Sequence, residues 1–493
     1  MIQVNDYTNA NHSTAGRVDP SFKHKLKSSF NGETLKYCYQ CGTCSSVCPI
    51  SKFIKTYRPN KMLELAKLGI KTLPQSNAFL FCSACTLCTK GCPQNVRVHE
   101  VFQALKDDAV ENESVISFVK QDFPDMLKSL SKELPLPVIY SWICLRPGEE
   151  TASEGFEAEV KKALLAQLEQ PADVFKIADN AKKVAVIGSG PAGLTAAWSL
   201  VKSGYRVTVF ESLDQPGGML RTGIPEYRLP KSIVSKEIDK IKAAGVEIRL
   251  DTKVTDDFFK MIVEGDEYQA VFIASGAYSS RRIRLDGEDL EGVIPALTFL
   301  EDYNMNGRAV VGDNVVVIGG GNVATDAAGA AIRCGAKSVK LYCLEDRKTM
   351  PAHEWEIEEI IADGVEIYPS FGPRTIRGDG TKVTGVEFMR CKSVLDENKR
   401  FNPVYDEKIL ENVEADTLIT AIGQGPDLSF LGEGINVFRG AVEIDKYTME
   451  TSLAGVFAGG DAAAGTASLI EAIIAGKTAS ASIMKYIEGL DKE

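Results

Sequence analysis

Long hydrophobic runs are missing from this chain of 493 residues. No segment approaches the roughly 20 consecutive apolar residues that a membrane helix needs, so the sequence predicts no membrane span. The first residues contain neither a basic stretch nor an apolar stretch, which argues against a secretory signal and favours a cytoplasmic protein. An excess of positive charge is missing too, and the net charge of −11 argues against nucleic acid as a partner.

Cysteine is plentiful: twelve are present, and eight of them fall into two runs of identical spacing. The runs are Cys38-x2-Cys41-x2-Cys44-x3-Cys48-Pro49 and Cys82-x2-Cys85-x2-Cys88-x3-Cys92-Pro93. Bacterial-type ferredoxins bind 4Fe–4S clusters with this spacing, and the fourth cysteine of each run ligates the other cluster. The predicted ligand sets are therefore Cys38, Cys41, Cys44 with Cys92, and Cys82, Cys85, Cys88 with Cys48. Two four-cysteine zinc sites are the weaker alternative, because zinc ribbons usually use paired Cys-x2-Cys motifs.

The charge is unevenly distributed. Residues 1–110 contain 14 Lys and Arg against 7 Asp and Glu, so this segment carries +7 and the remainder carries −18. Two interpretations stay open. The basic segment either balances the negative charge of bound clusters or forms a docking face for an acidic partner.

A glycine-rich turn follows the apolar strand that ends at Ile187. The turn and the start of the next helix contain Gly188, Gly190, Pro191, Ala192 and Gly193. Such glycines let backbone N–H groups approach a pyrophosphate at the helix N-terminus. Glu211 ends the following apolar run, where a carboxylate can accept a hydrogen bond from a ribose hydroxyl. The segment therefore predicts a dinucleotide site.

A second unit of the same kind follows about 130 residues later. A strand from Asp313 to Ile318 leads into Gly319, Gly321, Asn322, Val323 and Ala324. A helix over 324–334 and a strand over 338–343 complete the unit. Since one nucleotide does not need two pyrophosphate sites, two such units in one chain predict two bound dinucleotides.

Together these motifs resemble a two-nucleotide flavoprotein family. It includes the glutamate synthase small subunit, the N-terminal half of dihydropyrimidine dehydrogenase and the large subunit of NADH-dependent ferredoxin:NADP transhydrogenase. The segments that carry the resemblance are the two glycine turns, Glu211, Gly217–Pro230, Met350–Ala352 and Gly459–Asp461. Residues 30–110 resemble the iron–sulfur subunit of heterodisulfide reductases and related alpha-helical ferredoxins.

The resemblance implies an α/β fold. Two Rossmann-like dinucleotide-binding domains, one inserted in the other, should follow an α-helical di-cluster ferredoxin domain. The expected divisions are the ferredoxin module at 1–110, a helical connector at 111–180, an FAD-binding domain at 181–307 and 416–493, and an NAD(P)-binding domain at 308–415.

The resemblance also implies roles for individual residues. Glu211 should bind the adenosine ribose of FAD, Val254 should lie near the adenine, and Asp461 should lie on the ribityl chain. Gly218, Met219 and Arg228 should lie along the flavin, in an ordered loop from Gly217 to Pro230. The remaining cofactor-binding positions are Gly276, Gly423, Gly460, Ala467 and Ser468, the last at the start of a C-terminal helix whose positive end can face the flavin.

The choice of nicotinamide nucleotide depends on the end of the strand over 338–343. NADPH-using relatives commonly have Tyr-Arg-Arg there, whereas this chain has Tyr342-Cys343-Leu344, followed by Glu345 and Asp346. A carboxylate suits a free ribose hydroxyl and repels a 2′-phosphate, so Glu345 favours NADH. The alternative is that Arg347 or Lys348 reaches the phosphate of NADPH.

We expect an oxidoreductase subunit that passes electrons between NAD(P)H, FAD and two 4Fe–4S clusters. The expected partners are other redox subunits, within an electron-bifurcating or heterodisulfide-reductase-like complex, and a ferredoxin is one candidate. The cofactors do the chemistry, so no residue is named as catalytic. No Cys-x-x-Cys pair remains outside the cluster motifs, which argues against thioredoxin-reductase chemistry. The alternatives are a non-catalytic electron-wiring or assembly subunit and an electron donor like the glutamate synthase small subunit.

Overall fold

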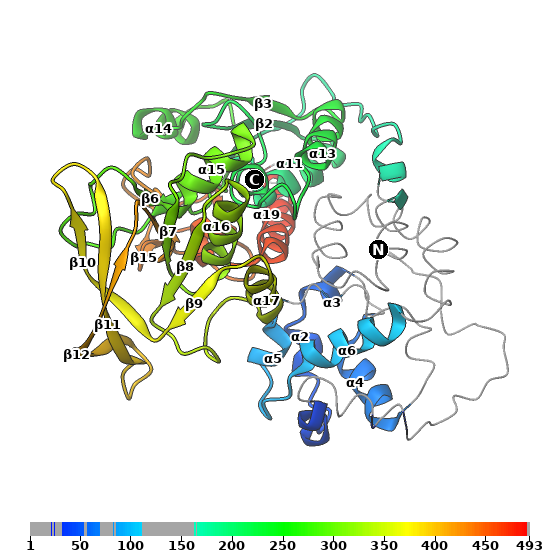
Figure 1. Cartoon of the computed structure of the whole chain (residues 1–493). Helices are drawn as coiled ribbons and strands as arrows, with labels where there is room; N and C mark the ends of the chain where they lie inside the picture. The colour runs from blue at the N-terminus through cyan, green and yellow to red at the C-terminus, as the bar shows by residue number, and fades with distance from the viewer. Residues whose placement is uncertain are drawn as a thin grey trace. The chain divides into compact units, whose positions relative to one another are not determined.

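The computed structural model describes residues 21, 24, 32–53, 57–69, 82, 85–110, 162–163 and 165–490. The chain divides into two compact units (Figure 1). Unit 1 comprises residues 1–172 and 468–474, and unit 2 comprises residues 173–467 and 475–493. Most of the predicted connector at 111–180 lies outside the described residues. Within the described ranges, no helix is long and apolar enough to cross a membrane.

Short helices make up the described part of unit 1. They are η1 (Gly32–Tyr37), α2 (Thr43–Ser46), α3 (Pro49–Phe53), α4 (Pro59–Leu68), α5 (Leu87–Lys90) and α6 (Val98–Val110). The two shortest, α2 and α5, are built alike, because each follows a residue with a left-handed backbone. These residues are Gly42, at φ 81°, and Thr86, at φ 60°. Each helix contains the third cysteine of its run, so the repeated spacing produces a repeated turn.

The core of unit 1 lies between α4 and α6. Apolar residues of α6 recur at helical spacing and are buried at Val98, Val101, Phe102 and Leu105. The ring of Phe102 meets the buried ring of Tyr57 edge-on, with centroids 6.5 Å apart. Tyr57 lies between the two cysteine runs in the sequence, so the segment that separates the runs supplies the packing that positions them.

Five parallel strands form the first sheet of unit 2, in the order β17-β4-β1-β2-β3. They are β1 (Lys183–Ile187), β2 (Arg206–Phe210), β3 (Glu247–Arg249), β4 (Ala270–Ile273) and β17 (Val456–Ala458). The accompanying helices are α11 (Pro191–Lys202), α12 (Met219–Thr222), α13 (Lys231–Ala243), α14 (Asp256–Glu264), α18 (Asp461–Ala464) and α19 (Leu469–Leu490). A small hairpin joins β15 (Val437–Phe438) to β16 (Ala441–Val442). We call this part the first half of unit 2.

The second half is built on another five-stranded parallel sheet, in the order β6-β13-β7-β8-β9. Its strands are β6 (Val293–Pro295), β7 (Asn314–Ile318), β8 (Ser338–Cys343), β9 (Glu366–Pro369) and β13 (Thr417–Thr420). Its helices are α15 (Ala296–Asn306), α16 (Asn322–Arg333) and α17 (Glu354–Ala362). Two short strands, β5 (Ser279–Ser280) and β14 (Gln424–Gly425), pair antiparallel where the chain crosses between the halves.

The second sheet extends beyond the range 308–415 that the sequence assigns to the nucleotide-binding domain. β6 and β13 lie outside that range, yet both belong to this sheet, with β13 paired between β6 and β7. Both flanks of the inserted sequence therefore take part in its sheet. β13 is a short strand that is buried throughout, and its pairing with β6 and β7 places it in the second sheet.

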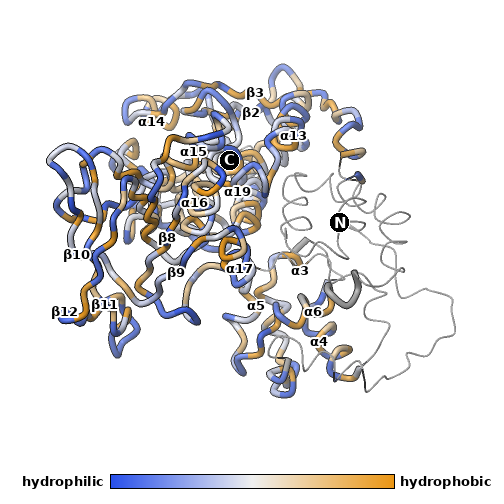
Figure 2. Tube along the Cα trace, viewed as in Figure 1, coloured by the Kyte–Doolittle hydropathy of each residue, from blue (hydrophilic) through white to orange (hydrophobic). Residues whose placement is uncertain are grey.

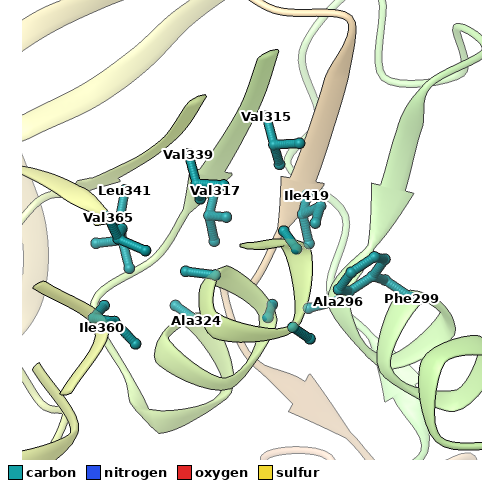
Figure 3. Packing of buried hydrophobic residues seen from close by; sticks show 14 of the residues in the cluster. Ala296, Phe299, Val315, Val317, Ala324, Val339, Leu341, Ile360, Val365 and Ile419 are labelled. Carbon is teal, nitrogen blue, oxygen red and sulfur yellow. The ribbon is translucent and has the colours of Figure 1, made fainter. Parts of the chain in front are cut away.

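Both faces of the second sheet are buried, because alternate side chains of its strands pack into cores on opposite sides. Val315 and Val317 of β7 point toward α16, where small residues such as Ala324 allow close approach (Figure 3). Val316 and Ile318, one residue out of phase, pack on the other face. Because the side chains of a strand alternate, the continuous apolar run from Val315 to Ile318 indicates a strand covered on both sides.

The cover on that other face is a three-stranded antiparallel sheet. It consists of β10 (Phe371–Gly378), β11 (Val383–Leu395) and β12 (Phe401–Glu414). Inward residues such as Val386 and Phe388 join the core beneath the parallel sheet. The loop joining β10 to β11 is hydrophilic, whereas apolar segments concentrate at the centre of unit 2 (Figure 2). The sequence reasoning did not identify this sheet.

Candidate functional site

The first glycine turn joins β1 to α11 and packs against β4. Gly188 donates its N–H to the Phe210 carbonyl at 2.8 Å and has φ +101°. A Cβ at Gly188 would lie 2.4 Å from the Ala274 carbonyl oxygen, and one at Gly193 would lie 2.0 Å from the Gly188 oxygen. A Cβ at Gly190, in contrast, would meet no protein atom within 4 Å. Two glycines therefore close the turn, and the third leaves open space beside the start of α11.

Glu211 lies at the end of β2 and is buried against this turn. Its Oε2 accepts hydrogen bonds from the Ser189 backbone N–H at 3.0 Å and from the Ser189 hydroxyl at 2.5 Å. Its Oε1 accepts from the Leu213 N–H at 2.9 Å. The sequence reasoning missed Ser189, which holds the predicted ribose-binding carboxylate beside the turn.

The loop from Gly217 to Pro230 is fastened to the same turn. The Gly217 N–H donates to the Ser189 hydroxyl at 2.9 Å. A Cβ at Gly218 would lie 2.9 Å from the Gly190 Cα, so the two backbones are in close contact there. Met219 begins α12, so the segment predicted as a loop contains one short helix. Gly218 and Met219 thus lie next to the open space beside Gly190.

Arg228, in the same loop, is buried and reaches across to the second half of unit 2. Its guanidinium contacts the carboxylates of Asp326, Glu356 and Glu359. Burial lowers the pKa of Arg228, but these carboxylates outweigh that effect and raise it. The predicted position of Arg228 along the flavin stays a prediction, and its acidic neighbours were not foreseen.

The other predicted FAD residues of unit 2 surround the carboxyl ends of the first sheet. Val254 packs in the core with Phe210. Gly276 has φ +71°, and a Cβ there would meet no protein atom within 4 Å. Gly460 has φ 64° and precedes Asp461, whose Oδ1 accepts from the Ala467 N–H at 3.2 Å.

Ser468, grouped with unit 1, caps the last helix locally. Its N–H and its hydroxyl both donate to the Glu471 carboxylate, at 2.9 and 2.7 Å. The bond from the Ser468 N–H to the Glu471 carboxylate is one half of a capping box, which is typical of a helix start.

The second glycine turn repeats the geometry of the first. Gly319 donates to the Tyr342 carbonyl at 2.8 Å, and a Cβ on Gly319 would lie 2.3 Å from the Ala421 oxygen. A Cβ on Gly321 would meet nothing within 4 Å. Here too one glycine packs against the neighbouring strand, and another leaves space at the start of the helix, which begins with Asn322, Val323 and Ala324. Gly423 lies at the crossing between the halves, where its carbonyl accepts from the Arg281 N–H.

Glu345 follows β8 and lies against the second turn. A Cβ at Gly320 would lie 2.9 Å from the Glu345 Oε2. Asp346 is engaged locally, because its Oδ1 accepts from the backbone N–H groups of Lys348 and Thr349. The carboxylate nearest the glycine turn is therefore Glu345, as the sequence predicts.

Arg347 is engaged by α17. Its guanidinium forms two parallel hydrogen bonds with the Glu354 carboxylate, at 2.9 and 2.5 Å. Glu354 raises the pKa of Arg347. The arginine that the alternative interpretation assigns to a 2′-phosphate is thus already paired.

The described cysteines fall into two neighbourhoods. Burial raises the pKa of Cys44 to about 11, with further contributions from Cys38 and Cys41. Burial likewise raises the pKa of Cys88, with contributions from Cys82, Cys85, Cys48 and, last, Cys44. Cys82 in turn contributes to the raised pKa of Cys48, so Cys48 lies near the second run. The exchange of fourth ligands stays a prediction.

Two N–H groups are directed at these sulfurs. The Gln40 side-chain amide donates to Cys38 Sγ, and the Val96 backbone N–H donates to Cys92 Sγ, each at 3.4 Å. Among the residues that the structure describes, no group of three or more His, Cys, Asp or Glu side chains could hold a metal ion. Cysteine thiolates with N–H donors to sulfur are the donor set of iron–sulfur clusters.

Comparisons with known proteins cover most of the chain. Residues 182–480 match the family model described as pyridine nucleotide-disulphide oxidoreductase, and residues 5–97 match that of a 4Fe-4S dicluster domain. The chain is 35% identical to the beta subunit of the NADP(+)-dependent formate dehydrogenase of Moorella thermoacetica, over 81% of this chain and 60% of that subunit. It therefore spans 60% of the length of that relative.

Two further comparisons cover a smaller share of the chain. The chain is 32% identical to the NADPH glutamate synthase small chain of Escherichia coli, over 64% of this chain and 71% of that protein. FprA of Mycobacterium tuberculosis in complex with NADPH has a TM-score of 0.54 over 64% of this chain and 86% of that chain. At 19% identity, this likeness shows the fold alone.

These findings confirm the predicted family resemblance, the fold class of Rossmann-like sheets and the class of enzyme. The chain belongs to the pyridine nucleotide-disulphide oxidoreductase family, and its N-terminal part matches a 4Fe-4S dicluster domain.

Proposed function

We propose that this chain is the NADH-oxidising subunit of a multi-subunit redox enzyme. The first half of unit 2 would hold FAD, the second half would hold NADH, and unit 1 would hold two 4Fe–4S clusters. The observation that carries the proposal is the repeated turn. Gly188 and Gly319 each pack against a neighbouring strand, while Gly190 and Gly321 each leave space for a ligand at a helix start.

The chain's residues bind and orient these groups. The backbone beside Gly190 would hold the pyrophosphate of FAD, and Glu211 would accept from its ribose. The loop that carries Gly218 and Met219 covers the same space. When bound, FAD supplies the exchange between two-electron hydride transfer and the single-electron transfers of the clusters. The proposed FAD residues are Gly188, Gly190, Pro191, Ala192, Gly193, Glu211, Gly218, Met219, Arg228, Val254, Gly276, Gly460, Asp461, Ala467 and Ser468.

A preference for NADH over NADPH is supported by the end of β8. Glu345 lies against the turn, where its carboxylate can accept from a free ribose hydroxyl and would repel a 2′-phosphate. Arg347, one of the two alternative partners for a phosphate, is paired with Glu354. The relatives' names specify NADP(+) and NADPH, so nucleotide preference is the point on which this chain is proposed to differ from them. The proposed nucleotide residues are Gly319, Gly321, Asn322, Val323, Ala324, Glu345 and Gly423.

The proposed partner is another redox subunit. The relatives include a subunit of a formate dehydrogenase and a chain of a glutamate synthase, and both names denote parts of larger enzymes. Cys41 is the exposed member of its cysteine run, whereas Cys44, Cys48 and Cys88 are buried. The cluster on Cys38, Cys41, Cys44 and Cys92 is therefore the one we expect to face the partner, in agreement with the positive charge of this module.

The test is an anaerobic titration of the purified chain with NADH and with NADPH in separate experiments. Flavin absorbance reports reduction of the FAD, and electron paramagnetic resonance reports reduction of the clusters. We expect NADH to bleach the flavin and then to reduce the clusters. A strong preference for NADPH would overturn the assignment of Glu345. A flavin that neither nucleotide bleaches would instead favour the alternative of a non-catalytic wiring subunit.

A further inference from the structure

Two helices of the second half direct their carboxylates at one guanidinium from the first half. Arg228 Nε lies 2.8 Å from Asp326 Oδ1, Nη1 lies 2.7 Å from Glu356 Oε1, and Nη2 lies 3.3 Å from Glu359 Oε2. The Arg228 side chain is 3% exposed, and none of the three carboxylate side chains is more than 15% exposed. Arg228 donates hydrogen bonds to Glu356 and Glu359, whereas the contact with Asp326 is a close ion pair without hydrogen-bond geometry. We call these four residues the Arg228 cluster.

Stability alone is a poor explanation for such a cluster. Removing charges from water costs several kcal/mol per ion, and well-packed apolar residues of similar volume often stabilise a protein at least as well. What the planar guanidinium provides instead is geometry, because it fixes several oxygens at once. Two aromatic rings add to this: the Arg228 guanidinium lies 5.0 Å from the ring of Trp355, and that of Arg333 lies 4.0 Å from the ring of Tyr227.

On the flavin side, short contacts join the cluster to the first glycine turn. Arg228 lies on the loop whose Gly217 N–H donates to Ser189 and whose Gly218 backbone contacts Gly190. A one-turn helix, α12, and a hydrogen bond from the Arg228 N–H to the Pro225 carbonyl at 3.0 Å order the loop between these points. The position of Arg228 is thus fixed relative to the proposed pyrophosphate site of FAD.

On the nucleotide side, the cluster is equally close to the second turn. Asp326 lies one turn into α16, the helix that starts at Asn322 beside Gly321. The Asn322 side-chain oxygen accepts from the His353 N–H at the start of α17, which carries Glu356 and Glu359. Thr325 donates its hydroxyl to the Glu356 carboxylate at 3.3 Å. Both helices that supply the carboxylates are therefore fixed to the turn that would hold the nicotinamide nucleotide.

We propose that Arg228 is a positioning residue for the reduction of the flavin by the nicotinamide nucleotide. By joining the loop at the first turn to α16 and α17 at the second turn, it sets where a bound nicotinamide lies relative to a bound flavin. Small displacements of reacting groups reduce rates strongly, so loss of this link should slow hydride transfer more than it weakens nucleotide binding. The proposal rests on the proposed FAD and nucleotide sites.

Protonation of Asp326 should make the stability of the Arg228 cluster depend on pH. Asp326 is fully buried, and burial raises its pKa to about 7 although Arg228 and Lys231 act in the opposite direction. The folded chain therefore favours the protonated acid: this contribution to stability is complete below about pH 4 and is lost as the pH rises through about 7. The charged and titratable groups around it on the loop, α13, α16 and α17 are Tyr227, Arg228, Lys231, Arg333, Glu356, Glu359 and Asp363.

The first experiment compares Arg228→Lys with Arg282→Lys in the full-length holoprotein. Lysine keeps the charge but cannot contact three carboxylates at once, and Arg282 pairs with Glu288 and Asp289 on an exposed surface. For Arg228→Lys we expect flavin reduction at saturating NADH to slow about tenfold, the NADH dissociation constant to change less than threefold, and the flavin to be retained. Arg282→Lys should match the wild type. Wild-type rates in Arg228→Lys would overturn the proposal. Loss of the flavin would also overturn it, because Arg228 would then act by holding FAD and not by positioning the two sites.

The second experiment uses Asp326→Asn, which keeps the shape of the side chain and mimics its protonated form. As the pH rises from 5 to 8, the midpoint temperature of thermal unfolding should decrease in the wild type. The decrease should be smaller in Asp326→Asn. The rate of flavin reduction should change with a midpoint near pH 7 in the wild type only. Equal pH profiles would refute the role of Asp326 and leave Arg228 without its argued partner. If Arg228→Lys does not fold, this variant decides the proposal.

The two proposals fail in different ways. A wild-type chain that binds no FAD, or whose FAD neither nucleotide reduces, would refute the proposed function. The dependence of unfolding on pH would still test the Arg228 cluster, because it needs neither nucleotide nor turnover. If the flavin is reduced normally but no variant of the cluster changes rate or pH profile, only the positioning role is refuted.

Discussion

The Ser189 hydroxyl donates to Glu211 Oε2 at 2.5 Å and, as an acceptor, binds the Gly217 N–H at 2.9 Å. One buried serine thus joins the glycine turn, the acidic residue after β2 and the loop that precedes α12. Each of these three segments is a separate motif in the sequence. Their convergence on a single hydroxyl fixes the three segments relative to one another.

Replacing Ser189 with alanine should weaken the proposed FAD site. The change leaves the buried Glu211 carboxylate with one donor fewer and the Gly217 N–H without its acceptor, at a cost of about 1–3 kcal/mol. We expect more flavin-free protein after purification and a weaker affinity for added FAD. Ser212→Ala is the matched control, because that exposed serine contacts Glu211 Oε1 at 3.3 Å. Equal flavin content in both variants would contradict the prediction.

Gly321→Ala should weaken binding at the second dinucleotide site and leave the first site unaffected. A methyl group at Gly321 meets no protein atom within 4 Å, and its backbone, at φ −96°, suits any residue. The chain should therefore fold and retain its flavin, while the methyl group occupies the space proposed for the nucleotide pyrophosphate. We expect nucleotide affinity to fall at least tenfold by calorimetry. Gly489→Ala, which is equally open but lies near the end of α19, should bind nucleotide normally. Unchanged nucleotide affinity in Gly321→Ala would contradict the proposal that the second turn binds the nucleotide pyrophosphate.

The sequence predicted these turns because backbone geometry at a glycine is local. Gly188 and Gly319 have φ of +101° and +143°, and their neighbours leave no room for a side chain. Asp326 and Glu356 could not be foreseen in the same way. An acid on a helix normally faces solvent, and only the packing of two halves of unit 2 brings these two residues to Arg228.

The sequence also could not predict which of the two sheets each buried strand joins. β4 and β13 are both four-residue strands that are buried throughout, and only pairing places one in each sheet. The antiparallel strands β10–β12 were missed because irregularities interrupt their alternation. The register between β11 and β12 shifts at three places, so inward and outward positions change phase along the strands.

Nucleotide preference should respond to the pair between Arg347 and Glu354. Glu354→Gln keeps the size of the side chain but frees the guanidinium, which can then turn toward a 2′-phosphate. Because the pair is partly exposed, we expect a modest shift of about fivefold toward NADPH. The measurement is the ratio of dissociation constants for NADPH and NADH. Glu345→Gln should shift the ratio in the same direction by removing repulsion. No change in either variant would place the determinant of preference elsewhere.

The exchange of fourth ligands between the cysteine runs can be tested by counting iron. If Cys48 belongs with Cys82, Cys85 and Cys88, then the double variant Cys48→Ser/Cys82→Ser damages a single cluster, and about four iron atoms per chain should remain. Cys48→Ser/Cys44→Ser damages both clusters, and little iron should remain. The opposite pattern would mean that each run ligates its own cluster. If the exchange holds, the electron paramagnetic resonance signal that survives in Cys48→Ser/Cys82→Ser belongs to the cluster at Cys41. That exposed cysteine is the one through which we expect electrons to reach the partner.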